Sequence, residues 1–165
     1  MSADHYRDVL REVQRIVQDQ DDSDEILRRV VDVLEERFDH YSWVGIYFVE
    51  GDELQLGPWN GPAATEHVRI PVGEGVCGAA AASGVTEIVD DVNADPRYLA
   101  CFASTRSEIV VPISYENIVV AEIDIDSDRP AAFGDADRRF LEDVAALVSP
   151  YCLVGWDTGG EPWEP

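Results

Sequence analysis

A short segment near residue 120 alternates acidic and apolar side chains in a way that only a β-strand can use. It reads Glu122-Ile123-Asp124-Ile125-Asp126. Successive side chains of a strand point to opposite faces, so the three carboxyls share one face and the two isoleucines the other. The isoleucine face is expected to pack on helices. Charge pattern alone favours a solvated carboxyl face, and the alternative is a binding site.

The chain from residue 43 to residue 50 shows a second alternation. One face would carry Trp43, Gly45 and Tyr47, and the other would carry Val44, Ile46 and Phe48. The aliphatic residues again suit a helix-packed side. The aromatic face would then lie on the same side of the sheet as the carboxyls.

Helical periodicity brackets this central region. Apolar residues recur at helical spacing over residues 3–18, with Ser2 as a possible cap, and again over residues 23–38, where Ser23 is the expected cap. A last helix would begin with Asp135 as its cap and end near Pro150. We therefore predict an α+β domain whose long helices cover one face of a mostly antiparallel sheet. The remaining elements predicted are strands at 54–58, 67–70, 87–89 and 108–115, a strand from 118 to 126 after a turn at Glu116-Asn117, and a short helix after Cys77.

The charge is unusual and limits the possible partners. The formal net charge is −22, and all 12 basic residues are Arg. The negative electrostatic field of such a charge repels nucleic acid and anionic lipid, so neither is an expected partner. A large cationic partner would complement the charge. Acidic residues are spread along the whole chain, however, and this favours adaptation of the protein to molar salt.

The three cysteines have no disulfide or zinc spacing. Cys77, Cys101 and Cys152 are far apart, and no CxxC or Cys/His cluster is present. Cys77 begins a short helix, where the macrodipole favours a thiolate. Cys101 lies in a segment without periodicity, and Cys152 follows a helical stripe that suggests packing. No metal or cofactor is expected.

Six sequence blocks, taken in order, closely resemble the free methionine-(R)-sulfoxide reductases, which are enzymes built on a GAF domain. The resemblance covers roughly residues 24–150. It implies a GAF-like fold with a central antiparallel sheet of about six strands, terminal helices on one face and a ligand pocket on the other. The blocks are Trp43–Tyr47, Leu56–Gly61, Gly75–Gly78, Ala100-Cys101, Ser107–Ile113 and Asp124–Ser127.

The resemblance also implies roles for individual residues. Cys101 resembles the family's nucleophile, and Cys77 resembles one of two cysteines that can resolve the oxidised nucleophile. The other matches are Glu108, Asp124 and Asp126 to the substrate-binding carboxylates, and Trp43 and Tyr47 to the aromatic pocket wall.

Two positions depart from the family's pattern. The stretch from residue 62 to residue 67 lacks the cysteine that is often the main resolving residue. Phe102 follows the nucleophile where the family tends to have Asp. Cys77 is therefore the evident resolving partner.

The expected function is reduction of free methionine (R)-sulfoxide, with thioredoxin or a similar dithiol as reductant. The alternatives are a non-catalytic GAF module that binds a small molecule or senses redox state, and a purely structural or partner-binding domain. We expect one domain over residues 1–156 and a flexible acidic tail over residues 157–165. The first 20 residues show no signal peptide, so we expect a cytoplasmic protein, with a homodimer as one option for its assembly.

Overall fold

Six strands form one antiparallel sheet in the order β3-β2-β1-β6-β5-β4. The computed structural model describes residues 1–100 and 102–153 of the 165. In chain order the elements are α1 (Ala3–Asp19), α2 (Ser23–Arg37), β1 (Trp43–Glu50), β2 (Glu53–Asn60), β3 (Arg69–Pro71), α3 (Gly75–Ser83), β4 (Glu87–Val89), the 3₁₀ turn η1 (Val92–Ala94), β5 (Ser107–Tyr115), β6 (Ile118–Ser127), α4 (Asp135–Val148) and the 3₁₀ turn η2 (Ser149–Tyr151).

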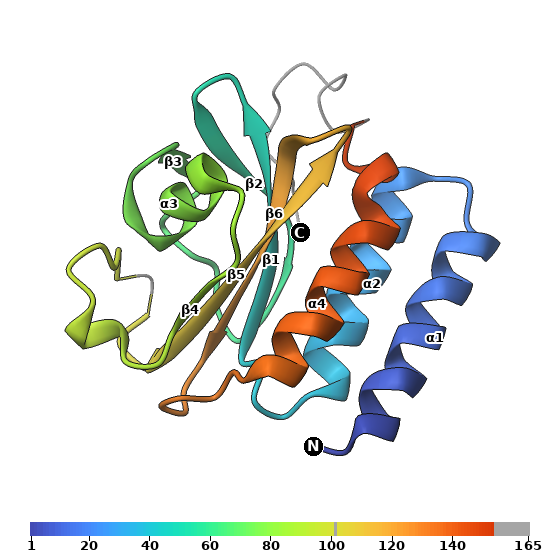
Figure 1. Cartoon of the computed structure of the whole chain (residues 1–165), viewed down its shortest axis with the longest axis horizontal. Coiled ribbons are helices and arrows are strands. Elements are labelled where there is room, and N and C mark those ends of the chain that lie inside the picture. The colour runs from blue at the N-terminus through green and yellow to red at the C-terminus, as the bar shows by residue number, and fades with distance from the viewer. Residues whose placement is uncertain (101, 154–165) are drawn as a thin grey trace.

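The long helices lie on one side of the sheet. Helices α2 and α4 pack on the strands, and α1 packs on α2 and α4 (Figure 1). Ile123 and Ile125 of β6 are completely buried in this core, together with Val44 and Ile46 of β1. The strand faces predicted from the alternation are therefore confirmed. Cys152 is also buried here, as its helical stripe suggested.

The opposite face of the sheet carries a second, smaller core. Helix α3 contacts β5, β6 and β3 across this face. Part of the loop between η1 and β5 packs there through Leu99 and Phe102. Trp43, Tyr47 and Cys77 are buried in this second core, so one side of the sheet builds the fold and the other collects the site residues.

The predicted helix caps are partly wrong by one residue. Ser2 does cap α1, since its hydroxyl accepts the His5 N–H at 3.3 Å. Helix α2 is capped by Asp22, not Ser23, because the Asp22 carboxylate accepts the Asp24 N–H at 2.9 Å. The N-cap of α4 is Gly134, not Asp135, and its N–H donates to the Asp137 carboxylate at 3.0 Å.

The hairpin between β5 and β6 turns as predicted. Glu116 and Asn117 have φ angles of 50° and 66°, the left-handed pair that a tight two-residue hairpin requires. Strand β3 begins at Arg69, two residues later than predicted, and Val68 before it is exposed. Helix α4 ends at Val148, and Pro150 lies in the following 3₁₀ turn.

Within the described residues, no helix combines the length and apolar character that crossing a membrane requires. The predicted acidic tail, residues 157–165, lies outside the part of the chain that the structure describes.

Candidate active site

The carboxyl face of β6 is buried, so the expectation of a solvated acidic face is wrong. Asp124 is 1% exposed and Asp126 is 2% exposed. Glu108 of β5 pairs directly with Asp126 across the sheet and is buried beside it. The cover comes from α3 and the loop before β5, and strand alternation alone contains no information about that cover.

Burial of three carboxyls together changes their acidity. Burial, followed by the charges of Asp124 and Asp126, raises the pKa of Glu108 well above its usual range. Burial also raises the pKa of Asp124 and Asp126. Like charges at this separation are not all ionised easily, so the trio holds protons more readily than surface carboxyls do.

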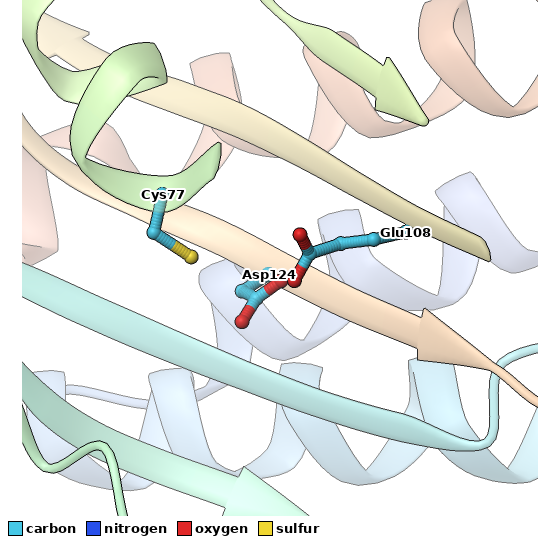
Figure 2. A group of neighbouring side chains, drawn as sticks. All are labelled: Cys77, Glu108 and Asp124. Carbon is cyan, nitrogen blue, oxygen red and sulfur yellow. The ribbon is translucent and has the colours of Figure 1, made fainter. Parts of the chain in front are cut away.

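Cys77 approaches this cluster from α3. Its Sγ and one carboxyl oxygen each of Glu108 and Asp124 all lie within 4.8 Å of one another. Figure 2 shows the three side chains pointing toward one another from α3, β5 and β6. These three buried side chains form the group of potential metal ligands among the described residues.

The thiol of Cys77 is not activated by its helix. Burial raises the pKa of Cys77 well above its usual value, and the charges of Asp124, Glu122, Glu108 and Asp126 add to the shift. The expected preference for thiolate at a helix start is therefore wrong, because loss of water and nearby carboxyls outweigh the macrodipole.

Aromatic side chains form the wall next to the carboxyls. Tyr47 is fully buried and donates its hydroxyl to the His67 carbonyl at 2.7 Å. The Trp43 ring stacks on Trp59 at a centroid distance of 6.3 Å, and Phe102 lies 6.0 Å from it. The Trp43 Nε1–H is buried and has no hydrogen-bond partner among the described residues, so it can donate to a ligand.

Two glycines make room for the Trp43 ring. A Cβ on Gly45 would lie 2.3 Å from the Trp43 ring, and one on Gly61 would lie 2.4 Å from it. Such contacts are far inside van der Waals separation. Each glycine lies within one of the six blocks that carry the family resemblance, but nothing local in the sequence shows that the Trp43 ring lies against it.

Cys101, the predicted nucleophile, lies outside the described residues. Its neighbours in the chain are described. The His67 ring contacts the Ala100 carbonyl at 3.1 Å, and Phe102 packs near Trp43. Ala100 thus contacts His67, whose carbonyl accepts the Tyr47 hydroxyl, and Phe102 contacts the aromatic wall.

Glu122 is the residue that the sequence reasoning missed. The alternation predicts that Glu122 lies on the carboxyl face of β6, but the family resemblance gives it no role in the site. It is 0% exposed, and within the described residues neither carboxyl oxygen has a hydrogen-bond partner. Burial and the charge of Asp124 raise its pKa well above the usual range, and the Cys77 thiol partly offsets this. The alternation shows that Glu122 shares a strand face with Asp124, but it does not show that this face is buried.

A small cavity lies at the centre of the site. Its volume is about 10 Å³, and its lining includes Cys77, Leu99, Glu108 and Asp124. This is the space of one water molecule, far below the several hundred Å³ of typical ligand pockets. Among the described residues, this cavity therefore has room for one small particle.

The fold and this arrangement define a GAF domain. The family model described as "GAF domain" matches residues 20–150. A six-stranded antiparallel sheet with helices on one face agrees with that assignment. The predicted α+β GAF-like fold is thereby confirmed.

Three relatives identify the branch within this class. Protein YtsP of Bacillus subtilis is 37% identical over 145 residues, covering 87% of this chain and 88% of the relative. The free methionine-R-sulfoxide reductase of Escherichia coli is 40% identical over 116 residues, covering 70% of this chain and 69% of the relative. A structure of free methionine-R-sulfoxide reductase from Neisseria meningitidis in complex with its substrate has a TM-score of 0.85 and 37% identity, and covers 95% of each chain. The chain belongs to the GAF-domain free methionine-R-sulfoxide reductase family.

Proposed function

We propose that this protein reduces free methionine (R)-sulfoxide to methionine. One observation carries the proposal: three buried carboxyls, those of Glu108, Asp124 and Asp126, form no ion pair with a basic side chain of the described residues. A ligand ammonium would supply the missing positive charge through charge-assisted hydrogen bonds. The family membership supports the same substrate.

The rest of the site suits the other end of the substrate. Trp43 and Tyr47 are buried beside the carboxyls and offer apolar ring surface to the methyl and thioether carbons. A substrate that must present a free ammonium cannot be a residue within a protein chain. The carboxyls therefore select free methionine sulfoxide over oxidised methionine in proteins.

The chemical step requires one thiol and the transfer of one proton. The Cys101 sulfur attacks the sulfoxide sulfur while a proton moves to the sulfoxide oxygen. Glu108 is the best proton donor, because burial and two neighbouring carboxylates raise its pKa. The oxygen then passes to the Cys101 sulfur as the substrate S–O bond and the new S–S bond break, so methionine leaves and Cys101 becomes a sulfenic acid.

A second thiol and an external dithiol complete the cycle. The Cys77 thiol condenses with the sulfenic acid, which releases water and forms a Cys77–Cys101 disulfide. Thioredoxin or a similar dithiol then reduces this disulfide. The 62–67 stretch has no cysteine to share the task, so the role falls to Cys77.

Product analysis tests the proposal directly. The protein is incubated in molar KCl with dithiothreitol and one epimer of free methionine sulfoxide, and methionine is measured by chromatography. The (R) epimer is expected to yield methionine and the (S) epimer none. The control is Cys101→Ser, and production no faster than in this variant ends the reductase proposal. N-acetylmethionine sulfoxide tests the ammonium requirement and is expected to react poorly.

A redox-sensing or ligand-binding GAF module is the second candidate. The absence of a cysteine in residues 62–67 favours it, since slow resolution suits a sensor better than a catalyst. The two are separated by turnover with thioredoxin and its reductase. More than one methionine per protein identifies an enzyme, whereas a single equivalent identifies a sensor.

A further inference from the structure

Together, Cys77, Glu108 and Asp124 offer the donor atoms of a metal site. Three donor atoms, one sulfur and two oxygens, lie within 4.8 Å of one another and come from three different elements (Figure 2). All three side chains are buried, with exposed fractions of 6%, 3% and 1%. Buried donors of this kind are held by the fold and not by chance contact on a surface.

Glu122 provides an independent observation that points to a cation. It is fully buried next to this group, acts electrostatically on the Cys77 thiol, and has two oxygens without a hydrogen-bond partner among the described residues. Asp124 Oδ1 is likewise buried and unpartnered in that part of the chain. Burying a carboxyl without a partner costs several kcal/mol of folding free energy. A cation bound to the free lone pairs of these oxygens would offset that cost.

The available space matches an ion better than an organic ligand. The cavity among these side chains has a volume of about 10 Å³. One water-sized particle fills such a space. A single metal ion can therefore occupy this cavity, whereas an amino acid is too large for it.

We propose that Cys77, Glu108 and Asp124 bind one divalent cation of intermediate softness, with zinc as the physiological candidate and Glu122 as a further buried carboxyl beside Cys77. A thiolate ligand favours zinc over magnesium or calcium, and carboxylate oxygens complete a typical zinc donor set. Zinc–ligand bonds are about 2.0–2.3 Å long, so the three donors must draw together slightly around the ion. Binding displaces the proton of the Cys77 thiol to solvent.

The metal and the substrate ammonium would use the same carboxyls. If the proposed function is correct, zinc therefore excludes free methionine sulfoxide and withholds Cys77 from disulfide formation. Zinc would then act as a reversible inhibitor that competes with the substrate. This consequence rests on the proposed function, whereas the metal site itself does not.

Cobalt(II) tests the site without any assay of activity. The reduced, metal-free protein is titrated with Co²⁺ in molar KCl, and thiolate-to-cobalt charge transfer is followed in the near ultraviolet. One equivalent is expected to saturate the signal, and Zn²⁺ is expected to abolish it. Cys77→Ser should lose the signal, while Cys101→Ser and the core variant Cys152→Ser should keep it. No signal in the parent protein, or one that survives Cys77→Ser, overturns the proposal.

The carboxyl ligands are tested by affinity. Glu108→Gln and Asp124→Asn are each expected to weaken Zn²⁺ binding at least about tenfold in competition titrations, since each removes an anionic ligand. Glu116→Gln, at an exposed position of the β5–β6 turn, is the matched control and should bind as the parent does. Equal affinities for all four proteins would refute the assignment.

The two proposals fail separately. A cobalt signal without methionine production removes the reductase proposal and keeps the metal site. Methionine production without a cobalt signal does the reverse. When both are present, added methionine sulfoxide should raise the apparent dissociation constant for Zn²⁺, and an unchanged constant would show that the metal binds elsewhere.

Discussion

At the scale of single residues, Glu122 is a buried carboxyl whose surroundings lower the stability of the fold. Both its oxygens are buried without a partner, and its strand neighbour Asp124 adds a like charge. Replacing a buried, poorly compensated ionisable group with an apolar side chain of similar volume commonly stabilises a protein. The residue thus reduces the stability of the fold and is explained by the site and not by packing.

Glu122→Met is therefore expected to stabilise the metal-free protein by about 1–3 kcal/mol, because it removes an unpartnered carboxyl without leaving a void. The measurement is denaturant unfolding in molar KCl with a chelator. Glu116→Met at the exposed turn is the control, and a change within about 0.5 kcal/mol is expected there. A destabilised Glu122→Met protein would contradict this account of Glu122.

Asp137 shows the opposite case, a buried carboxylate that is fully compensated. Its Oδ1 accepts hydrogen bonds from the hydroxyls of Tyr41 and Tyr6 at 2.7 and 2.9 Å, and it lies 2.9 Å from His40 Nε2. Its Oδ2 accepts the Gly134 N–H at the start of α4. Burial alone would raise its pKa, but the hydrogen bonds outweigh burial and lower it.

Asp137→Asn should destabilise the protein by about 2–3 kcal/mol, since the amide is a weaker acceptor and places an NH₂ donor against the Gly134 N–H. The lowered pKa adds a pH dependence. The stabilisation is present above the unfolded-state pKa of about 3.9 and is lost as pH falls through the lower folded-state value.

Unfolding free energies measured at pH 7 and at successively lower pH check both effects. The difference between parent and Asp137→Asn should shrink below about pH 4. Asp143→Asn, at an exposed position of the same helix, should show neither effect. A difference that stays constant with pH would mean that the Asp137 carboxylate does not matter.

At the scale of elements, strand β1 positions its aromatic residues by means of a glycine. Because a Cβ at Gly45 would lie 2.3 Å from the Trp43 ring, Gly45→Ala must displace that ring. We expect a loss of about 1–3 kcal/mol in stability and a several-fold higher KM for methionine sulfoxide. Thermal unfolding and steady-state kinetics measure the two effects.

Gly134→Ala is the matched control for this substitution. No atom outside its neighbours lies within 4 Å of a Cβ built at Gly134, and its φ of −119° suits alanine. Its cost should stay below about 1 kcal/mol, with KM unchanged. An unchanged KM in Gly45→Ala as well would show that the position of Trp43 does not affect substrate binding.

At the level of elements, the strand faces could be predicted from the sequence, whereas the burial of the carboxyls could not. Alternation along β1 and β6 correctly separated Ile123 and Ile125 from Asp124 and Asp126, because the strand period is a local property. Burial of the carboxyls depends on α3 and the loop with Leu99, which are distant in sequence. In so acidic a chain, Glu122 could not be told from a surface residue, because only tertiary packing distinguishes the two.

At the scale of the whole molecule, the two faces of the sheet have different roles: one carries the main core and the other carries the candidate site. Its helix-covered face holds the larger core, and its other face holds a small core that includes Trp43, Tyr47 and Cys77. Changes at the Asp137 network should therefore alter unfolding without altering the site. Changes at Glu108 or Asp124 should alter the site and also the free energy of unfolding, because both carboxyls are buried.

The net charge of −22 is a property of the whole molecule, and it sets the last prediction. Self-repulsion acts over the Debye length, which is about 30 Å at 0.01 M salt and 3 Å at 1 M. Thermal stability should rise steeply with KCl at low concentration and level off as screening becomes complete. Sucrose, which leaves charges unscreened, should give a shallow and nearly linear rise.

A charge-reduced variant separates screening from other effects of salt. Changing five exposed aspartates to asparagine lowers the negative charge without touching the site; they are Asp21, Asp39, Asp52, Asp90 and Asp143. Its melting temperature at low salt should exceed that of the parent, and the two should converge in molar KCl. Parallel curves would show that salt acts by a route other than screening, and a melting temperature independent of KCl would remove the idea of salt adaptation altogether.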